Sequence, residues 1–355
     1  MLYPLIVGTA DPSHPAVSAY AFSVTLAIQD ITGEANSGVS AAHIAKRLED
    51  SEESTALLFA LCNKTAPRSL GAFGYPILTE DDLYDVEGWV LVSLPLLEDV
   101  DVLEANVTVD ASIAPLPGEE QPPHVWQSAL ELIDALSTAL SRPIRHIWVT
   151  EPTGASEHPF LRDADYTPAH CEVQATIDAK SIIAPVPETA CDVVRDMSFD
   201  KADLPHFLDT LQESAAKYPR GSLLLEPVQW SPSRLREAAA RLKDRGGSQV
   251  TAIARDASGT PVGLAEVAKF DNDADSVAEI GLVYVRENNR GIRLGQRALV
   301  SALSAACSVW PEIEQFYVSY PAPQPGKHHL LARYSPTVIS QATAWQKSTH
   351  RSHDR

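Results

Sequence analysis

A short arginine-rich segment, VRENNRGIRLGQRAL at Val285–Leu299, carries the clearest chemical signal in the sequence. Four arginines and a single glutamate fall within residues 286–297. An alternating apolar stretch ends at Val285 and a helical pattern begins inside the segment, which places Gly291 and Gly295 in a strand-to-helix connection. Backbone N–H groups of such a loop, together with the first helical turn, bind anions such as a pyrophosphate. The alternative interpretation is a solvated helix face with glycine turns.

The rest of the chain makes this basic segment unusual. The 355 residues carry a formal net charge of −19, and the pI is near 4.9. An acidic surface argues against broad binding to nucleic acid or to anionic membranes, because phosphate groups require a basic footprint. Hydrophobic residues make up 45% and charged residues 21%, a mixture typical of folded globular proteins. We therefore expect neither a nucleic-acid partner nor a membrane partner.

Other kinds of catalytic chemistry have little support. The four cysteines are scattered without metal-binding spacing, so we expect reduced, buried thiols and no metal site. The sequence contains no HExxH pair, no GxSxG nucleophile turn and no Walker-type phosphate loop. The amino terminus has no basic region followed by a long apolar stretch, and the apolar run around Trp89 is too short to cross a bilayer. We expect a cytoplasmic protein.

Two parts of the chain repeat one plan of three strands, a helix and a closing strand. In the first part we predict strands over Ala56–Lys64, Ser69–Ile77 and Glu104–Ser112, a helix over Val125–Leu140 and a strand over Arg145–Thr150. In the second part we predict strands over Val250–Asp256, Pro261–Phe270 and Ala278–Val285, a helix over Leu294–Trp310 and a strand over Glu314–Tyr320. This order favours an α/β arrangement around mixed sheets.

The domain boundaries follow from this repeat. We interpret Ser181–Val193, which has two prolines and few polar residues, as a linker. The chain then divides into domains at 1–185 and 186–346 and a polar tail at 347–355. We predict a helix over Lys201–Lys217 and another over Ser231–Arg245, the latter capped by Ser231.

The strand, loop and helix around Val285–Leu299 resemble the GNAT family of acyl-CoA N-acyltransferases. The family signature V-x-P-x-x-R-G-x-G-(I/L)-G-x-x-L stands here as V-R-E-N-N-R-G-I-R-L-G-Q-R-A-L, with Glu287 at the usual proline and Arg293 at the middle glycine. The form is similar to that of an actinobacterial subgroup with two tandem domains, which includes relatives of mycothiol synthase. The resemblance implies two tandem GNAT-like domains of the α/β (α+β) class, each a mixed, mostly antiparallel sheet flanked by helices.

The resemblance also implies roles for individual residues. Acetyl-CoA would be the co-substrate, with its pantetheine along the strand and its pyrophosphate on the loop. The implied cofactor-binding residues are Val283, Val285, Arg286, Arg290, Gly291, Ile292, Arg293, Leu294, Gly295 and Gln296. An amine would attack the thioester directly, which requires a base for the ammonium proton and an acid for the leaving thiolate.

Four residues are candidates for these proton transfers. Glu279 and Glu266 are the candidate bases, Tyr334 is the candidate acid, and Tyr320 is a weaker one. The alternative interpretation is an exposed strand carboxylate in the first two cases and a packed side chain for the tyrosines.

Two regions depart from the family pattern. After Tyr320 the sequence has three prolines within five residues and lacks the subgroup's asparagine-rich segment. In the first domain the corresponding loop, Ser112–Trp126, has four prolines, Glu119 and Glu120, and no arginine. Because carboxylates repel a pyrophosphate, we predict that the first domain does not bind CoA in the usual way.

We therefore favour an acetyl-CoA-dependent N-acetyltransferase that acts on a small-molecule amine, with its active site in the second domain. A catalytically inactive GNAT-like protein that binds CoA or a protein partner is the alternative, and a purely structural tandem module is a third. We expect a monomer or a homodimer.

Overall fold

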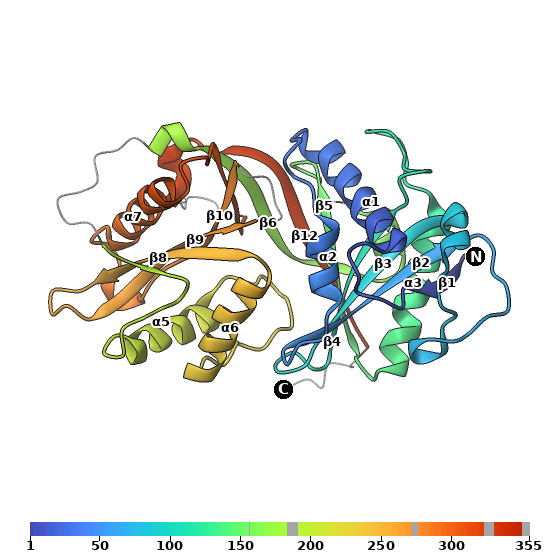
Figure 1. Cartoon of the computed structure of the whole chain (residues 1–355), viewed down its shortest axis with the longest axis horizontal. Coiled ribbons are helices and arrows are strands. Elements are labelled where there is room, and N and C mark those ends of the chain that lie inside the picture. The colour runs from blue at the N-terminus through green and yellow to red at the C-terminus, as the bar shows by residue number, and fades with distance from the viewer. Residues whose placement is uncertain (156, 183–190, 272–275, 323–329, 350–355) are drawn as a thin grey trace. The chain divides into compact units, whose positions relative to one another are not determined.

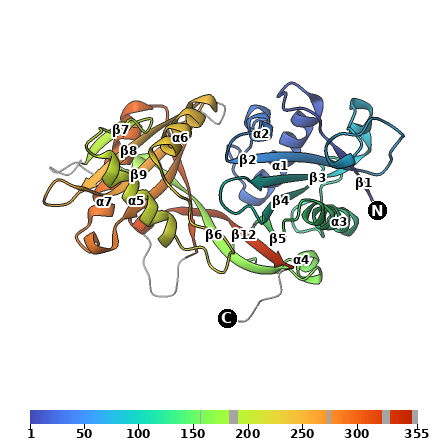
Figure 2. The same cartoon turned by 90° about the horizontal axis from the view of Figure 1, so that it is seen from below.

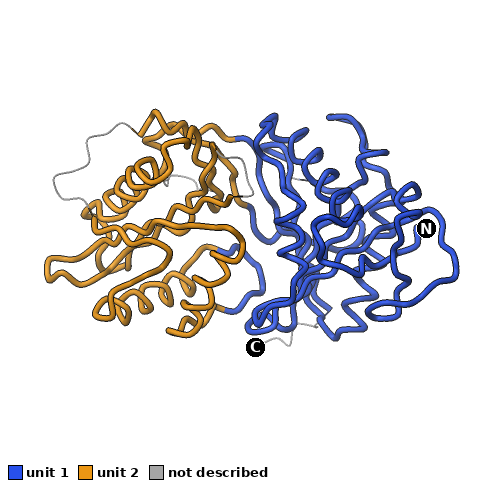
Figure 3. Tube along the Cα trace, in the orientation of Figure 1, with its two compact units in different colours: residues 1–171, 220–226, 339–355 blue, residues 172–219, 227–338 orange. Residues whose placement is uncertain are grey.

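The chain forms two compact units. A computed structural model describes residues 1–155, 157–182, 191–271, 276–322 and 330–349 (Figures 1 and 2). Unit 1 contains residues 1–171, residues 220–226 and the segment from Ile339 onward, and unit 2 contains residues 172–219 and 227–338 (Figure 3). The division of the sequence into domains at 1–185 and 186–346 with a tail at 347–355 concerns duplicated halves along the chain, and it stays a prediction.

Unit 1 is built on a sheet with the strand order β1-β2-β3-β4-β5-β12. Its strands are β1 (Tyr3–Ile6), β2 (Ser54–Cys62), β3 (Val86–Pro95), β4 (Val102–Val109), β5 (Ile144–Glu151) and β12 (Thr337–Ser348). Neighbouring strands are antiparallel except β4 and β5. The helices α1 (Pro15–Thr32) and α2 (Ala41–Leu48) cover one face of the sheet, and α3 (Pro123–Ala139) and the short α4 (Pro159–Asp163) lie on the other (Figure 2).

Unit 2 repeats this plan with the strand order β6-β11-β10-β9-β8-β7. Its strands are β6 (Thr167–Asp178, from Glu172 onward), β7 (Asp192–Arg195), β8 (Gly247–Arg255), β9 (Pro261–Phe270), β10 (Val277–Val285) and β11 (Gln315–Pro321). Only β10 and β11 are parallel among its strand pairs. The helix α7 (Leu294–Val309) packs on one face, and α5 (Leu204–Lys217) and α6 (Pro232–Asp244) pack on the other (Figure 1).

Most predicted elements are present, and the predicted α/β class with mixed, mostly antiparallel sheets is confirmed. The two helices with apolar residues at helical spacing are α3 and α7, whose buried side chains fill the largest cores of their units. Ser231 caps α6 as predicted, because its side chain accepts a hydrogen bond from the N–H of Arg234.

One predicted strand is wrong. Residues Ser69–Ile77 form a loop around a short 3-10 helix (Ala72–Gly74), closed by an isolated bridge between Leu70 and Pro76, and both Phe73 and Gly74 adopt positive φ. The place beside β2 belongs instead to β3, which contains the apolar run around Trp89. Because β3 is almost entirely buried, it has no alternation of apolar and polar residues to mark it as a strand.

The predicted linker and the predicted polar tail also differ from the structure. Of the predicted linker Ser181–Val193, residues 183–190 lie outside the described part of the chain, and Asp192 already begins β7. Of the predicted tail, Lys347 and Ser348 belong to β12 and pair with β5, while residues 350–355 lie outside the described part.

The last strand of each half of the sequence pairs with a strand from the other half. The strand β6 follows β5 in sequence but pairs with β11, and β12 follows β11 but pairs with β5. Trp345 of β12 is 1% exposed and belongs to the core beneath α3, so unit 1 needs the C-terminal strand to complete its core. Within the part of the chain that the structure describes, none of the helices combines the length and the apolar character needed to span a bilayer.

Candidate functional site

A cavity of about 620 Å³ opens in unit 2 where β10 ends and α7 begins. The lining residues are Val283, Tyr284, Val285, Asn289, Arg290, Gly291, Arg293, Leu294, Gly295, Gln296 and Leu330. All of the predicted cofactor-binding residues except Arg286 and Ile292 are among them. The sequence interpretation missed Tyr284, Asn289 and Leu330, of which the first two lie within the predicted strand and loop and had no separate signal.

One wall of the cavity is a strand edge. The strands β10 and β11 pair in parallel only from Val277 to Ile280. Beyond Ile280 a β-bulge shifts the register of β10 against β9, and pairing on that side resumes at Val283. The described residues of β10 after Ile280 therefore have no ladder partner in β11, and such an edge offers backbone N–H and C=O groups to an extended ligand.

The opposite wall is the start of α7. Its N-cap residue is Arg293, which lies in the left-handed region at φ 62° and whose side chain makes no capping hydrogen bond. The first backbone N–H groups of a helix have no intrahelical acceptor, and those of Leu294, Gly295 and Gln296 border the cavity. Gly291 lies at φ +88°, a conformation that a side chain would strain. Backbone N–H groups in this arrangement, together with the helix dipole, favour an anion at the start of a helix.

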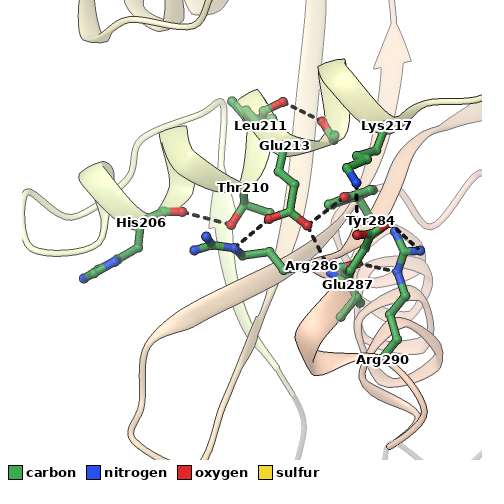
Figure 4. Close-up of polar contacts among 11 residues, drawn as sticks. His206, Thr210, Leu211, Glu213, Lys217, Tyr284, Arg286, Glu287 and Arg290 are labelled. Carbon is green, nitrogen blue, oxygen red and sulfur yellow. Dashed lines mark hydrogen bonds and ion pairs between the residues drawn. The ribbon is translucent and has the colours of Figure 1, made fainter.

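The loop arginines have different surroundings. Arg290 lines the cavity, donates from Nε to the carbonyl oxygen of Val285 at 2.9 Å and lies with its guanidinium carbon 5.2 Å from the ring centroid of Tyr284. Arg286 turns to Glu213 on α5, with Nε 3.1 Å from Oε2, and does not line the cavity (Figure 4). Ile292 is 65% exposed and also lies outside the lining.

The two candidate bases lie on one face of the unit 2 sheet. The residues flanking them in β9 and β10 pack in the α7 core, so Glu266 and Glu279 face away from α7. Glu266 is half-buried beside the β-bulge, where burial raises its pKa to about 7 despite hydrogen bonds from the backbone of Leu282 and the side chain of Gln249. Glu279 is exposed and stands beside Tyr317 of β11 in the parallel register.

The two candidate acids are both buried. Tyr334 ends a 3-10 helix (Leu330–Tyr334) whose first residue lines the cavity. It is 6% exposed, and its hydroxyl group has no hydrogen-bond partner within the described residues. Its side chain packs in the α7 core and is not among the residues that line the cavity. Tyr320 packs in the α7 core, and burial raises the pKa of both tyrosines.

No protein-family model and no curated protein matches the chain. Among solved structures, a tandem GNAT protein from the clavulanic acid biosynthesis pathway matches with a TM-score of 0.66 at 16% identity, over 99% of this chain and 100% of that one. A GCN5-related N-acetyltransferase from Sphaerobacter thermophilus matches with a TM-score of 0.57 at 14% identity, over 99% of this chain and 98% of that one. The chain therefore has the tandem GNAT fold, as the resemblance implied.

Proposed function

We propose that this chain, which has the tandem GNAT fold, is an acetyl-CoA-dependent N-acetyltransferase with its active site in unit 2. The observation that carries the proposal is one cavity bounded by an edge of β10 that has no ladder partner in β11 among the described residues, by a left-handed glycine loop and by the start of α7, where the N-cap side chain makes no capping hydrogen bond. These three features suit an extended, anionic ligand of the kind that acyl-CoA represents.

The residues present fit acetyl-CoA as a co-substrate. The backbone of Val283 and Val285 would hold the pantetheine, and the N–H groups from Gly291 to Gln296 would hold the pyrophosphate with Arg290. The bound thioester supplies an activated acetyl group. Arg293 adds a second positive charge at the same end of the cavity, which favours an anion within a chain of net charge −19.

Glu266 is the residue best suited to act as the base. Since its pKa is about 7, a substantial fraction of its carboxylate is ionised near neutral pH, and it can accept a proton from an ammonium group. The exposed Glu279, on the same sheet face, is the second candidate. The hydroxyl group of Tyr334, which has no hydrogen-bond partner among the described residues, would donate the proton that a leaving thiolate requires.

Calorimetry with acetyl-CoA tests this site. We expect the unaltered chain to bind acetyl-CoA, and Arg290→Glu and Gly291→Glu each to weaken the affinity about hundredfold, because both place a carboxylate in an anion site. The exposed Arg236 on α6 provides a control, since Arg236→Glu makes the same change in net charge as Arg290→Glu but lies outside the cavity. Unchanged affinity in both loop variants would overturn the site assignment.

A second candidate is a GNAT-like protein that binds CoA or a protein partner without turnover. The proline-rich sequence after Tyr320 favours it, because this is where the family supplies its acid and part of its cofactor contacts; residues 323–329 lie outside the described part of the chain. Incubation of acetyl-CoA with a broad panel of amines separates the two functions. Thioester cleavage that the loop variants abolish supports the enzyme, and tight binding with no cleavage supports the alternative.

A further inference from the structure

Glu213 connects the helix on one face of the unit 2 sheet to the loop that borders the cavity. It lies in α5, on the opposite face from α7, and its carboxylate reaches the end of β10 (Figure 4). Oε1 accepts hydrogen bonds from the Tyr284 hydroxyl and from the Glu287 N–H, both at 3.0 Å. Oε2 accepts one from Arg286 Nε at 3.1 Å. One side chain thus fixes both sides of the strand-to-loop junction.

The surroundings of Glu213 keep it ionised. Burial acts to raise its pKa, but the hydrogen bonds from Glu287 N–H, Tyr284 and Arg286 outweigh burial and hold the pKa below its usual range. Hydrogen bonds from a cation to a carboxylate are stronger than those between neutral groups. We therefore expect the junction to remain held across the neutral range of pH.

Two of these contacts lead directly to the cavity. The Tyr284 hydroxyl is held by Glu213, and the ring of the same tyrosine lies under the Arg290 guanidinium at 5.2 Å. Glu287 begins the short 3-10 turn Glu287–Asn289, which runs directly into Arg290 and Gly291. The Glu213 carboxylate also takes up the positive charge of Arg286, which leaves Arg290 and Arg293 as the loop arginines that line the cavity.

We infer that Glu213 is a positioning residue, which acts through Tyr284 and Glu287 to hold Arg290 and Gly291 in the conformation that receives the anionic end of the co-substrate. The inference rests on the proposed function for the identity of that co-substrate. It goes beyond it by assigning a role to α5, a helix that contributes no residue to the lining of the cavity.

A separation of KM from kcat distinguishes this role from a general structural one. We expect Glu213→Ala to raise the KM for acetyl-CoA about tenfold and Glu213→Gln to raise it less, because glutamine still accepts hydrogen bonds but loses the charge. The kcat at saturating acetyl-CoA should not change, since we assign proton transfer to Glu266 and Tyr334. Asp209→Asn is the matched control, because Asp209 is an exposed carboxylate on the same helix.

Tyr284→Phe tests the proposed route. It removes the hydroxyl that Glu213 holds but keeps the ring under Arg290. We expect it to raise KM less than Glu213→Ala does. Combined with Glu213→Ala, it should add little, because both changes break the same contact.

Hydrogen exchange of the ligand-free protein provides a readout that does not depend on acetyl-CoA. Backbone N–H groups in residues 286–297 should exchange several-fold faster in Glu213→Ala than in Asp209→Asn, because the loop loses two of its anchors. Equal exchange and equal acetyl-CoA affinity in the Glu213 and Asp209 variants would overturn the inference. Failure of the unaltered chain to bind acetyl-CoA would instead overturn the proposed function, and faster exchange in Glu213→Ala would still support the anchor.

Discussion

In unit 1 the residue that follows β4 is Asp110, whereas in unit 2 the residue that follows β10 is Arg286. Asp110 accepts hydrogen bonds from Trp89 Nε1 at 2.8 Å and from the hydroxyl group of Ser23 on α1 at 3.1 Å. Arg286 donates to Glu213 on α5. Each strand end is therefore hydrogen-bonded to a helix on the sheet face opposite α3 or α7. The residue at the strand end is an aspartate in unit 1 and an arginine in unit 2.

The loops that follow continue this contrast. In unit 1 the Glu119 carboxylate accepts a hydrogen bond from the Leu116 N–H at 2.9 Å, so a backbone N–H group of this loop is already bound by a carboxylate of the same loop. The helix α3 begins behind Pro122 and Pro123, which have no N–H to donate. In unit 2 the cavity instead borders on the N–H groups at the start of α7. The same strand-loop-helix order thus presents a carboxylate and prolines in unit 1 and backbone N–H groups in unit 2, and we expect only the latter to favour an anion.

The space beside the helix also differs between the units. In unit 1, the ring of Trp126 on α3 stacks on that of Phe160, with 6.0 Å between the ring centroids. It meets the ring of His158 edge-on, with 4.3 Å between the centroids. The strands β4 and β5 stop pairing after Ala105, as their counterparts do in unit 2, but Asn106 Nδ2 donates to the carbonyl oxygen of Trp148 across the gap. In unit 1 a side chain therefore bridges the two strands where they separate, whereas in unit 2 the cavity borders β10 beyond the corresponding point, and this difference favours the prediction that the first domain does not bind CoA in the usual way.

The largest expected effect concerns Glu266 of β9. The corresponding strand of unit 1 is β3, which has the buried Trp89 and Leu91 on this face. We expect Glu266→Gln to lower kcat about thousandfold, equivalent to about 4 kcal/mol, because an amide cannot accept the proton. The kcat/KM of the unaltered enzyme should rise with pH through about 7, as the carboxylate with the raised pKa becomes ionised, and this rise should be absent in the variant. Glu279→Gln should keep the rise, and its loss there instead would make Glu279 the base.

The next effect tests whether unit 1 is only a structural partner. Trp345→Ala should lower the free energy of unfolding of unit 1 by about 3 kcal/mol or more, because it empties a fully buried site in the core beneath α3. Acetyl-CoA affinity, measured by calorimetry below the unfolding transition, should be kept. Phe316→Ala, in the α7 core of unit 2, is the matched control and should lower both quantities. Equal loss of affinity in the two variants would mean that unit 1 contributes to the site.

The sequence predicted best where a single local pattern decides the structure. The helices α3 and α7 have apolar residues at helical spacing, and the loop from Arg290 to Gly295 has glycines and arginines in a recognisable order. Arg293 stands where the family pattern has a glycine, and the structure explains that glycine preference, because this position has positive φ.

Elements that depend on distant contacts could not be predicted in this way. The exchange of β6 and β12 is decided by which sheet edge is open, and no local pattern encodes it. The helix α1 is apolar around much of its circumference and has no acidic residue in its first turn. Its sequence therefore lacks both an amphipathic pattern and an acidic helix start, the two common signals of a helix. Glu213 resembles any polar residue of an amphipathic helix, because its partners lie about seventy residues further along the chain.

A smaller effect concerns His158, which is buried in unit 1 against the rings of Trp126, Phe160 and Trp345. Burial lowers the pKa of His158 to about 4, below the value near 6.5 of an unfolded chain. The unfolded state therefore binds the proton first, and the free energy of unfolding of unit 1 should fall by about 2 kcal/mol as the pH decreases from about 7 to about 4.5. Denaturant titrations at both pH values measure this loss. It should be largely absent in His158→Gln, and an equal loss in that variant would assign the acid sensitivity to other groups.

The smallest effect separates charge from backbone strain at Arg293, since the loop of unit 1 (Ser112–Trp126) contains no arginine. Left-handed backbone costs about 1 kcal/mol for most residues, and asparagine tolerates it better. Arg293→Asn should therefore raise the free energy of unfolding of unit 2 by about 0.5 kcal/mol while it weakens acetyl-CoA binding about threefold, because one partly solvated charge is lost. Arg293→Lys keeps both the charge and the strain, and should leave stability and affinity nearly unchanged. If Arg293→Asn stabilised the unit without weakening binding, Arg293 would have no part in the anion site, and the contrast between the two loops would rest on Arg290 and the backbone N–H groups alone.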